Sequence, residues 1–403
     1  MTKYIEKNRA EGEINAPTSK SVAHRLLIAA AMCGGKTSVI DGITPCEDVL
    51  ATIDCLRALG AKINYSGERA EVDGIDFRIA KPSDTLNCRE SGSTLRFLIP
   101  LCLLSGNDVT LTGSEKLISR PQTVYEEIAE RENFYFKKES DRISLSGSLS
   151  AGEYYLPGNV SSQFITGLLF ALSTLEGDSK IIITTKLESR SYVDLTIQAM
   201  AEFGVNVCWD SDSVLLIRGG QEYSARTITV EGDYSGAAFI DAFNHLGGRV
   251  LIHGLNEKSL QGDRVYREHF DALDSGFATI DIEDCPDLGP ILFAMAAVKS
   301  GGHFTGTKRL KIKESDRAEA MRQELYKFGC ELVIEGNSVT VKKCELHAPT
   351  EKLCGHNDHR IVMSLAVILT LFGGEIEGCE AVSKSYPDFF LDIKKLGIST
   401  YEI

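Results

Sequence analysis

The feature that most constrains the fold of this chain is a sequence motif that recurs six times. Each copy is an apolar helical stretch, followed by glycine and then by a short β-branched run, as in LLIAAAMCGGKTSVI and ILFAMAAVKSGGHFT. Successive copies lie 71, 71, 71, 54 and 72 residues apart. Self-similarity at a fixed period is the signature of repeated supersecondary units, so a sixfold repeat is predicted. The marker glycines are Gly35, Gly106, Gly177, Gly248, Gly302 and Gly374.

A second sequence motif follows several copies of the first. In this motif a predicted helix ends in an apolar residue, which is followed by glycine and then by a predicted strand. It reads LRALGAKIN, MAEFGVNVCW, LYKFGCELVI and IKKLGIST. A helix that turns sharply into a strand needs a positive φ just beyond its end, which glycine adopts without steric cost. The Val, Ile and Thr residues after the glycine favour a strand. Each repeat is therefore predicted to run strand–helix–strand–helix–strand–strand.

The expected fold class is α/β, with two similar domains, each built from three βαβαββ units with pseudo-threefold symmetry. One unit cannot bury both faces of its helices, whereas three units packed around a shared axis can. A chain of 403 residues is also long enough for two domains of about 200 residues each. The shortened fourth interval marks a place where a repeat is trimmed. The alternative is six unrelated helix–strand turns, which would not keep so regular a spacing.

Composition excludes several classes of protein. The formal net charge of −14 argues against non-specific binding to nucleic acid or to an anionic membrane surface. The longest apolar runs, 288–298 and 361–372, are shorter than the ~20 residues of a membrane span. There are 11 cysteines, an odd number with no C-x-x-C pair, which is typical of reduced, buried thiols. Residues 1–17 are charged and lack a signal-peptide core, so a cytoplasmic protein is expected.

Common cofactor motifs are not satisfied. The Gly35-Lys36-Thr37 triplet resembles the end of a P-loop, but the glycine required five residues earlier is Ala30. No G-x-G-x-x-G follows a predicted strand, so a dinucleotide fold has no support. His356 and His359 could suggest a metal, but no third ligand is nearby in the sequence. No metal and no cofactor are expected.

The first three repeats each begin their apolar helix with a turn suited to an anion. The turns contain small polar residues or glycine, and helix N-termini carry free N–H groups that attract phosphate. Taken alone, each turn could equally be an ordinary helix cap with solvated cations. The recurrence in three consecutive repeats favours a functional interpretation. The three segments are residues 17–25, 90–96 and 158–164.

Lysines, arginines and two carboxylates lie at the starts of further sequence motifs throughout the chain. Further segments of this kind are 119–121, 189–192, 311–317, 355–360 and 383–388. A salt-bridged helix face is the alternative for the densest of them, KIKESDR. So many cations in an acidic protein indicate polyanionic substrates, since arginine binds phosphate and carboxylate through paired hydrogen bonds. The set comprises Lys20, Arg25, Arg96, Arg120, Lys313, Arg317, Arg360 and Lys384, with Asp287 and Glu314 as the carboxylates.

In this order, the segments resemble the 5-enolpyruvylshikimate-3-phosphate synthase family of enolpyruvyl transferases. The most specific pieces are SKS-x-x-x-R, SGST-x-x-R, S-RP, SSQF-x-T, KESDR and NDHR followed by K-x-x-PD, and they span 16–388. The resemblance implies two domains joined by two crossovers, with the active site in the cleft between them. The first domain would combine 1–18 with 231–403, and the second would be 19–230.

The resemblance also implies the reaction and the ligands. The enzyme would transfer the enolpyruvyl group of phosphoenolpyruvate to the 5-hydroxyl of shikimate-3-phosphate, releasing phosphate, in the shikimate pathway to chorismate and the aromatic amino acids. Shikimate-3-phosphate would be bound by Ser21, Arg25, Ser161, Ser162, Gln163, Ser189, Tyr192, Asp287 and Lys313. Phosphoenolpyruvate would be bound by Lys20, Gly92, Arg120, Gln163, Arg317, Arg360 and Lys384. Arg96 matches the motif but is expected to hold its loop.

The reaction needs acid–base groups on both sides of the new bond. By the resemblance, Glu314 serves proton transfer at C3 of phosphoenolpyruvate, and Asp287 with Lys20 serves the attacking hydroxyl. The expected partners are these two small molecules only, with no nucleic acid or membrane, and the expected state is a monomer. Thr18 stands where the family often has glycine and Glu90 where asparagine is frequent, which puts the geometry of both loops and the response to inhibitors in doubt.

Two other functions remain as alternatives. The related transferase that uses UDP-N-acetylglucosamine usually has Lys-Asn where this chain has Lys20-Ser21, and it carries a loop cysteine that residues 114–120 lack. A non-catalytic phosphate-binding repeat protein would keep the serine turns but would not need Asp287 and Glu314.

Overall fold

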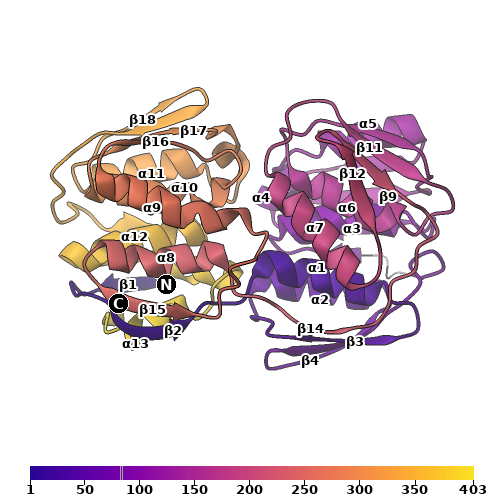
Figure 1. The fold of residues 1–403 in the computed structure, drawn as a ribbon, viewed down its shortest axis with the longest axis horizontal. Helices are drawn as coiled ribbons and strands as arrows, with labels where there is room; N and C mark the ends of the chain where they lie inside the picture. Colours follow the sequence, from indigo (N-terminus) through magenta and orange to yellow (C-terminus); the bar gives the residue numbers. More distant parts are fainter. Residues whose placement is uncertain (82, 84) are drawn as a thin grey trace. The chain divides into compact units, whose positions relative to one another are not determined.

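The computed structural model describes residues 1–81, 83 and 85–403. The chain divides into two compact units, which we call unit 1 and unit 2. Unit 1 comprises Met1–Ser19 and Gly232–Ile403, and unit 2 comprises Lys20–Glu231 (Figure 1). These limits lie one residue from the expected ones, so Ser19 falls in unit 1 and Glu231 in unit 2. The fold is the expected α/β arrangement of repeated units, in which small sheets surround buried helices.

Unit 2 contains three copies of one repeat, each with two principal helices and a four-stranded sheet. The first copy has α1 (Lys20–Ala31), β3 (Thr37–Asp41), α2 (Glu47–Ala58), β4 (Lys62–Ser66) and β5 (Arg69–Asp73). The second has β6 (Thr85–Asn87), α3 (Gly92–Cys102), β7 (Val109–Thr112), α4 (Glu115–Ser119), α5 (Thr123–Glu132), β8 (Tyr135–Lys138) and β9 (Arg142–Ser146). The third has β10 (Glu153–Leu156), α6 (Ser162–Leu172), β11 (Ser179–Ile183), α7 (Arg190–Glu202), β12 (Val207–Ser211) and β13 (Val214–Ile217).

The three sheets share one strand order, which confirms the predicted repeat. They are β14-β3-β5-β4, β6-β7-β9-β8 and β10-β11-β13-β12. In each, the entering strand is parallel to the second strand, and the last two strands form an antiparallel hairpin. The entering strand of the first sheet is β14 (Thr227–Thr229), which comes from the end of the unit and is parallel to β3. The last strand of the unit therefore completes the first sheet.

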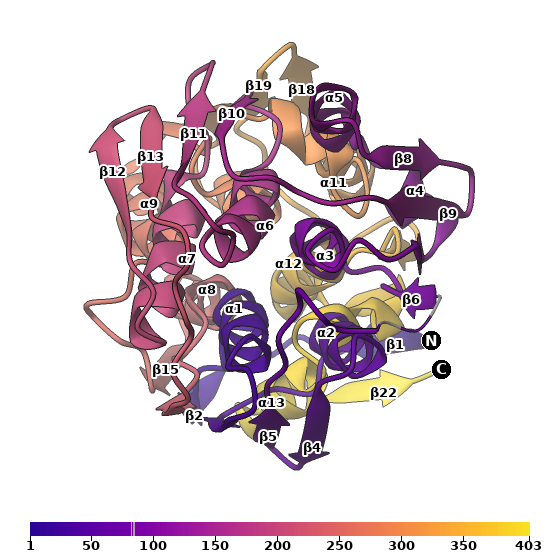
Figure 2. The same cartoon turned by 90° about the vertical axis from the view of Figure 1, so that its right-hand side faces the viewer.

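The first helix of each repeat is buried in the core of its unit. In unit 2 these helices are α1, α3 and α6, and α3 packs along α6 (Figure 2). Ten of the 11 residues of α6 are buried. In unit 1 the corresponding α10 is apolar on all sides and buried almost throughout, as expected of a helix surrounded by protein. The polar residues at the starts of these helices are therefore held by well-packed supports.

Unit 1 contains the other three repeats, which include the chain's N-terminal strands. Its elements are β1 (Thr2–Ile5), β2 (Glu11–Asn15), α8 (Tyr234–His245), β15 (Arg249–His253), η1 (Gly262–Val265), α9 (Tyr266–Ser275), β16 (Ala278–Asp281), η2 (Pro286–Leu288), α10 (Gly289–Val298), β17 (Gly302–Thr305), η3 (Lys308–Ile312), α11 (Arg317–Tyr326), β18 (Leu332–Glu335), β19 (Ser338–Val341), β20 (Leu353–Cys354), α12 (His359–Phe372), β21 (Gly374–Glu377), η4 (Cys379–Lys384), α13 (Phe389–Lys395) and β22 (Thr400–Glu402), where η denotes a 3₁₀ helix. Its sheets are β20-β21-β1-β22, β16-β17-β19-β18 and β15-β2.

The two-stranded sheet β15-β2 is the trimmed repeat. After α9 the chain enters β16 with only Gly276 and Phe277 between them, so the hairpin that completes the other sheets is missing. This accounts for the shortened interval of the sequence repeat. The side chain of Asn244 partly replaces the missing strand, because its Oδ1 accepts from the Val250 N–H at 2.6 Å and its Nδ2 donates to the Val250 carbonyl at 2.9 Å. Backbone groups that an antiparallel strand would pair are thus satisfied by one amide.

The glycines of the second sequence motif have the positive φ that a turn from helix to strand requires. Gly60, Gly204, Gly329 and Gly397 have φ of 110°, 83°, 84° and 88°, each just after a helix. In the second repeat the same place is taken by Asn133, with φ of 57°. Positive φ at these turns was predicted from the sequence, and asparagine is the residue that most readily substitutes for glycine there.

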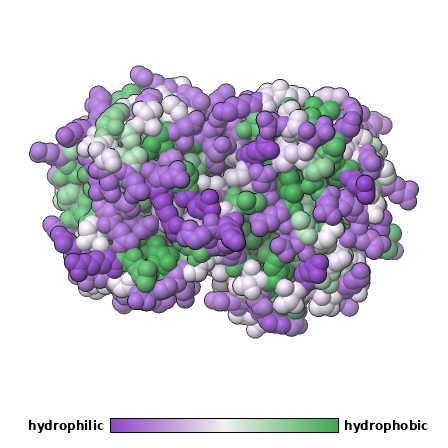
Figure 3. Space-filling view, viewed as in Figure 1, coloured by the Kyte–Doolittle hydropathy of each residue, from purple (hydrophilic) through white to green (hydrophobic). Residues whose placement is uncertain are grey.

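The surface gives no sign of a large apolar patch on the face drawn in Figure 3, which is mostly hydrophilic with scattered apolar residues. No helix in the described part of the chain is long and apolar enough to cross a membrane.

Candidate functional site

The expected anion-binding turns lie at the starts of buried helices, and the structure shows why the helices begin there. Ser91 caps α3, Ser161 caps α6 and Asp358 caps α12, each accepting from a backbone N–H two or three residues ahead at 3.2, 3.3 and 2.9 Å. The caps use only one of the free N–H groups that each helix start carries. The remaining groups and the helix dipole favour an anion at these ends.

Lys20 is the first residue of α1 and is held by an acid of the same repeat. Its Nζ lies 2.8 Å from Oδ2 of Asp48 in α2, and the two side chains are only 18% and 12% exposed. The backbone carbonyl of Asp48 in turn accepts from Thr94 Oγ1 of α3 at 3.4 Å. The ammonium of Lys20 is therefore oriented by contacts that reach from α1 to α3.

Arg25 lies one turn further along α1 and is buried. Its Nε donates to Thr196 Oγ1 at 2.8 Å, Nη1 to the Ser21 carbonyl at 2.7 Å and Nη2 to the Tyr192 carbonyl at 2.9 Å. Burial lowers the pKa of Arg25 to about 10, so the guanidinium remains charged at neutral pH. Arg25 thus orders the backbone that carries Ser21 and Tyr192, two residues expected to bind the same substrate.

Arg96 and Gln163 link the starts of α3 and α6. Nη1 of Arg96 donates to Gln163 Oε1 at 2.8 Å, and Nη2 donates to the Pro121 carbonyl at 3.0 Å. Gln163 Nε2 donates to Ser93 Oγ at 3.0 Å. The Arg96 guanidinium also lies over the Phe164 ring, 4.8 Å from its centroid. Arg96 therefore holds two groups in place, the Gln163 amide and the turn at Pro121 that follows Arg120.

Gly92 stands beside Arg120, and its lack of a side chain matters. A Cβ at this position would lie 2.9 Å from Arg120 Nη1 and 3.6 Å from Gln163 Oε1. Arg120 is 9% exposed, and its carbonyl accepts from Lys138 Nζ at 3.0 Å. Any larger residue at 92 would therefore displace the guanidinium from the start of α3.

The serines expected to bind a phosphate lie at the starts of two neighbouring helices, α6 and α7, which pack together. Ser161 and Ser162 cap and begin α6, while Ser189 precedes α7. Ser189 has φ of 58°, a left-handed conformation that is uncommon outside glycine and asparagine. Tyr192 follows in the first turn of α7. The hydroxyl-bearing residues of this group, which we call the serine cluster, thus lie at the starts of two helices that pack together.

In unit 1, several of the expected acids and cations form one network of ion pairs, which we call the acid–cation cluster. Its members are Asp287, Lys313, Glu314, Arg317, Asp358 and Arg360. Asp287 is its centre and is 19% exposed. Its Oδ1 lies 3.1 Å from Lys313 Nζ and 2.8 Å from Arg317 Nη1, and its Oδ2 lies 2.9 Å from Arg360 Nη2. Three cations thus surround this one carboxylate.

Arg317 connects three carboxylates of the cluster. Besides Asp287, its Nη2 lies 2.7 Å from Glu314 Oε2 and its Nε lies 2.8 Å from Asp358 Oδ2. Arg317 is 1% exposed and Asp358 is fully buried. Sequence reasoning did not assign Asp358 to the site, although an acid that caps a helix two residues before an arginine in the NDHR motif was an available signal.

Burial and neighbouring charge act in opposite directions on this cluster. Burial alone would raise the pKa of Asp358, but the Arg317 guanidinium holds it below its ordinary value. For Lys313, burial lowers the pKa; Asp287 opposes this shift, and Arg317 and Arg309 add to it. The cluster is therefore a desolvated set of charges that depend on one another.

Lys384 lies near the start of α12, where its Nζ donates to the Asn357 carbonyl at 2.7 Å. The preceding His356 and Asn357 both have left-handed φ, of 49° and 52°, which shapes this turn. His356 Nε2 lies 2.9 Å from Glu324 Oε1, an acid that also binds Lys327 at 2.8 Å. His356 is thus engaged by an ion-pair network of α11.

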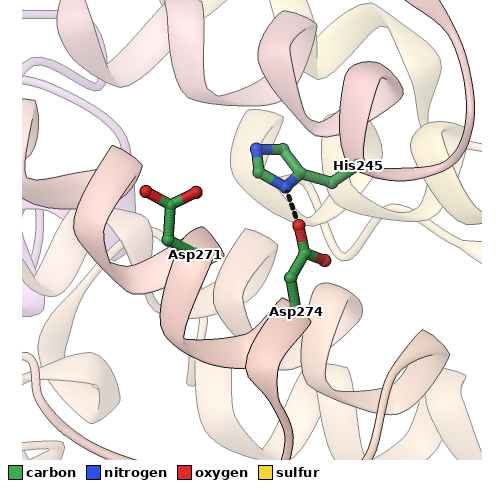
Figure 4. Close-up of side chains that lie close together, drawn as sticks. All are labelled: His245, Asp271 and Asp274. Carbon is green, nitrogen blue, oxygen red and sulfur yellow. Dashed lines mark hydrogen bonds and ion pairs between the residues drawn. The ribbon is translucent and has the colours of Figure 1, made fainter.

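One group of three potential metal ligands occurs among the described residues, at the ends of α8 and α9. It comprises His245, Asp271 and Asp274 (Figure 4). Asp274 is already bound on both oxygens, by His245 Nδ1 at 2.5 Å and by Lys299 Nζ at 2.7 Å. Lys299 Nζ also donates to the His245 carbonyl at 2.6 Å. These contacts join the ends of three helices, so we interpret the group as structural.

The expected site residues therefore fall into two groups. Lys20, Ser21, Arg25, Gly92, Arg120, Ser161, Ser162, Gln163, Ser189 and Tyr192 lie in unit 2, and Asp287, Lys313, Glu314, Arg317, Arg360 and Lys384 lie in unit 1. Thr18, one of the departures from the family pattern, forms an isolated antiparallel bridge with Gly232 where the chain leaves and re-enters unit 1. Glu90 lies in the turn before α3.

Comparison with known proteins identifies relatives over almost the whole chain. Residues 5–393 match the family described as EPSP synthase (3-phosphoshikimate 1-carboxyvinyltransferase). The 3-phosphoshikimate 1-carboxyvinyltransferase of Clostridium kluyveri is 40% identical, covering 98% of this chain and 97% of the relative. The enzyme of the same name from Clostridioides difficile is 37% identical, covering 98% and 97%.

Solved structures show the same fold. An EPSP synthase from Acinetobacter baumannii superimposes with a TM-score of 0.78 over 100% of both chains, at 22% sequence identity. A second structure of EPSP synthase from this organism has a TM-score of 0.79 at 21% identity.

Proposed function

Since the chain belongs to the EPSP synthase family, we propose that it catalyses transfer of the enolpyruvyl group of phosphoenolpyruvate to the 5-hydroxyl of shikimate-3-phosphate, with release of phosphate. The observations that carry the proposal are a desolvated acid–cation cluster within unit 1 and, within unit 2, helix starts that bear hydroxyls and cations. Family membership over residues 5–393 supports it. The reaction belongs to the shikimate pathway, which leads to chorismate and the aromatic amino acids.

Shikimate-3-phosphate would bind at the serine cluster. Its phosphate would accept hydrogen bonds from the hydroxyls and free N–H groups at the starts of α6 and α7. Arg25 would hold Ser21 and Tyr192 in place, and the amide of Gln163, fixed by Arg96, would lie against the ring. The residues proposed for this substrate are Ser21, Arg25, Ser161, Ser162, Gln163, Ser189, Tyr192, Asp287 and Lys313.

Phosphoenolpyruvate would bind to cations from both units. Arginine forks match its phosphate and carboxylate groups, and Gly92 leaves room for the Arg120 guanidinium beside the start of α3. The residues proposed for this substrate are Lys20, Gly92, Arg120, Gln163, Arg317, Arg360 and Lys384.

The reaction would proceed by addition and elimination. The hydroxyl oxygen attacks C2 while its proton passes to Asp287, assisted by Lys20, and C3 gains a proton from Glu314. In the tetrahedral intermediate the bond between C2 and the phosphate oxygen then breaks, the departing phosphate takes up the proton held by Asp287, and C3 returns its proton to Glu314. Each acid–base group typically contributes about 10²–10⁴-fold to the rate. The cations stabilise the departing phosphate, and no step requires a metal or a cofactor.

Arg317 would link substrate binding to the protonation of Glu314. In the structure Nη2 of Arg317 is 2.7 Å from Glu314 and Nη1 is 2.8 Å from Asp287. A phosphoenolpyruvate anion that recruits this guanidinium must compete with the two carboxylates. Glu314 would then lose its counter-ion, and its proton affinity would rise at the moment when it has to act as an acid.

The two groups of site residues lie on different units, so we propose that the units close around the substrates. Closure would complete the site and exclude water, which otherwise competes for C2. Small-angle X-ray scattering is expected to show a smaller radius of gyration with shikimate-3-phosphate than without it, and unchanged dimensions would contradict closure. We further propose a cytoplasmic enzyme that works as a monomer on these two small molecules.

The direct test of function is phosphate release with both substrates. We expect turnover with shikimate-3-phosphate and phosphoenolpyruvate, and background release when UDP-N-acetylglucosamine replaces the acceptor. Binding of both substrates without turnover would instead support a phosphate-binding repeat protein. Turnover only with the UDP-sugar would identify the related transferase.

A further inference from the structure

A chain of buried hydrogen bonds connects three helices of unit 2 and has no part in the mechanism proposed above. Nδ1 of His24 in α1 lies 2.7 Å from Thr52 Oγ1 of α2, which lies 2.6 Å from Thr94 Oγ1 of α3. Thr94 Oγ1 in turn donates to Ser91 Oγ at 2.7 Å. All four side chains are fully buried. We call these residues, His24, Thr52, Thr94 and Ser91, the His24 chain.

The direction of these hydrogen bonds follows from the hydrogens that are available. A threonine hydroxyl has one hydrogen, and that of Thr94 is directed to Ser91. Thr94 Oγ1 must therefore accept from the hydroxyl of Thr52. Because Thr52 uses its own hydrogen in this way, it must accept from His24, so the imidazole hydrogen is on Nδ1.

The surroundings of His24 agree with a neutral ring that carries its hydrogen on Nδ1. Burial lowers the pKa of His24 well below its ordinary value, and the charges of Lys20 and Arg25 add to this shift. Nε2 of His24 has no hydrogen-bond partner among the described residues. A hydrogen on Nε2 would therefore be a buried donor without an acceptor, which is costly.

The far end of the His24 chain supports the start of α3. Ser91 caps this helix by accepting from the Thr94 N–H at 3.2 Å. Gly92 is the first residue of α3, and a Cβ there would lie 2.9 Å from Arg120 Nη1. The position of this helix start therefore sets the space in which the Arg120 guanidinium lies.

The same threonine also contacts the residue that holds Lys20. Thr94 Oγ1 lies 3.4 Å from the backbone carbonyl of Asp48 in α2. The Asp48 carboxylate accepts from Lys20 Nζ at 2.8 Å. Lys20 and Arg120, two of the cations proposed to bind phosphoenolpyruvate, thus both depend on groups that the His24 chain contacts.

We propose that His24 is a positioning residue for the binding of phosphoenolpyruvate. Its Nδ1 hydrogen orients the two threonines of the His24 chain, and these hold the cap of α3 and the backbone of Asp48. Because it is fully buried, His24 touches neither substrate in this role, and it transfers no proton. The proposal rests on the function proposed above, in which Lys20 and Arg120 bind phosphoenolpyruvate.

Steady-state kinetics of two variants at His24 tests this role. His24→Leu can still pack against the Phe97 ring of α3 but has no donor, so we expect KM for phosphoenolpyruvate to rise about tenfold, the effect of one lost buried hydrogen bond. KM for shikimate-3-phosphate should stay unchanged. His24→Asn places an amide N–H donor near the position of Nδ1 and should restore most of the affinity. An unchanged KM for phosphoenolpyruvate in His24→Leu, or a rise that His24→Asn does not reduce, would overturn the proposal.

Thr52 provides an independent pair of variants and allows a double-mutant test. Thr52→Val keeps the shape of the side chain but removes the hydroxyl, so it should raise the same KM, whereas Thr52→Ser should not. His24→Leu combined with Thr52→Val should be no worse than either change alone, because both break one chain; additive effects would overturn the link. Ile28→Val, at a buried residue one turn further along α1, is the matched control. If it raised this KM as much as His24→Leu does, lost packing in α1 would explain the effect and the proposal would fail.

A measurement that does not depend on activity locates the hydrogen on His24. Long-range ¹H–¹⁵N NMR spectra of protein labelled with ¹⁵N-histidine show which ring nitrogen carries the hydrogen, and His24→Asn identifies the His24 signals among those of the 8 histidines. We expect the hydrogen on Nδ1 at neutral pH, and a hydrogen on Nε2 would overturn the proposal. If the wild type released no phosphate, the proposed function and the effect on KM would both fail, whereas the spectra would still decide the direction of the His24 chain.

Discussion

Replacing Glu314 with glutamine is expected to lower kcat by about 10²–10⁴-fold while both substrates still bind. Glutamine has nearly the same shape as glutamate and can still accept a hydrogen bond from Arg317, whose Nη2 lies 2.7 Å from Glu314 Oε2. It cannot, however, give a proton to C3 or take one back. Single-turnover phosphate release, together with calorimetric binding of shikimate-3-phosphate, separates the chemical step from binding.

Glu319 provides the matched control for this prediction, because it is a glutamate in the first turn of α11 that binds only surface partners. Its carboxylate pairs with Arg322 at 2.5 Å and accepts from Gln323 at 2.8 Å. Glu319→Gln should keep wild-type turnover. If Glu314→Gln turned over as fast as this control, Glu314 would have no part in proton transfer, and another acid of the cluster would have to supply the proton.

The repeat architecture could be predicted from the sequence because its determinants are local. A glycine with positive φ is needed wherever a helix turns into a strand, as at Gly60 and Gly204, and such positions recur with the period of the repeat. The polar turns at the helix starts are equally local, since a helix start carries its caps, such as Ser91 and Ser161, within a few consecutive residues. Both features can be predicted from the sequence without knowledge of contacts between distant residues.

Features that depend on long-range packing could not be predicted in the same way. The repeat spacing indicated a trimmed unit, but not that a hairpin was missing or that Asn244 satisfies the backbone of Val250 in its place. The cations of the last segments were found, but their partners were not, because Arg317 meets Asp287 and Asp358 from different repeats. The burial of Asp263 and its hydrogen bond from Ser235 likewise arise only when η1 packs against α8.

Removing the Arg317 guanidinium is expected to cause the largest loss of stability in unit 1. Asp358 is fully buried, and Arg317→Gln would leave it without its principal counter-ion. Breaking a buried ion pair from one side typically costs about 3–5 kcal/mol, because a charge remains without compensation. Arg322→Gln, which breaks an exposed pair on the same helix, should cost at most about 1 kcal/mol. Urea unfolding of both variants and the wild type measures the difference.

The loss caused by Arg317→Gln should depend on pH in a direction that identifies Asp358 as its origin. In the wild type the pKa of Asp358 is depressed in the folded state, so its stabilisation is present above the unfolded pKa and is lost as pH falls through the folded value. In the variant burial acts without Arg317, and the pKa of Asp358 should instead rise above its unfolded value. The penalty is then largest at neutral pH and shrinks as acidification neutralises the buried carboxylate. A gap between wild type and variant that stays constant from neutral to acidic pH would show that lost packing, and not the stranded charge, accounts for the destabilisation.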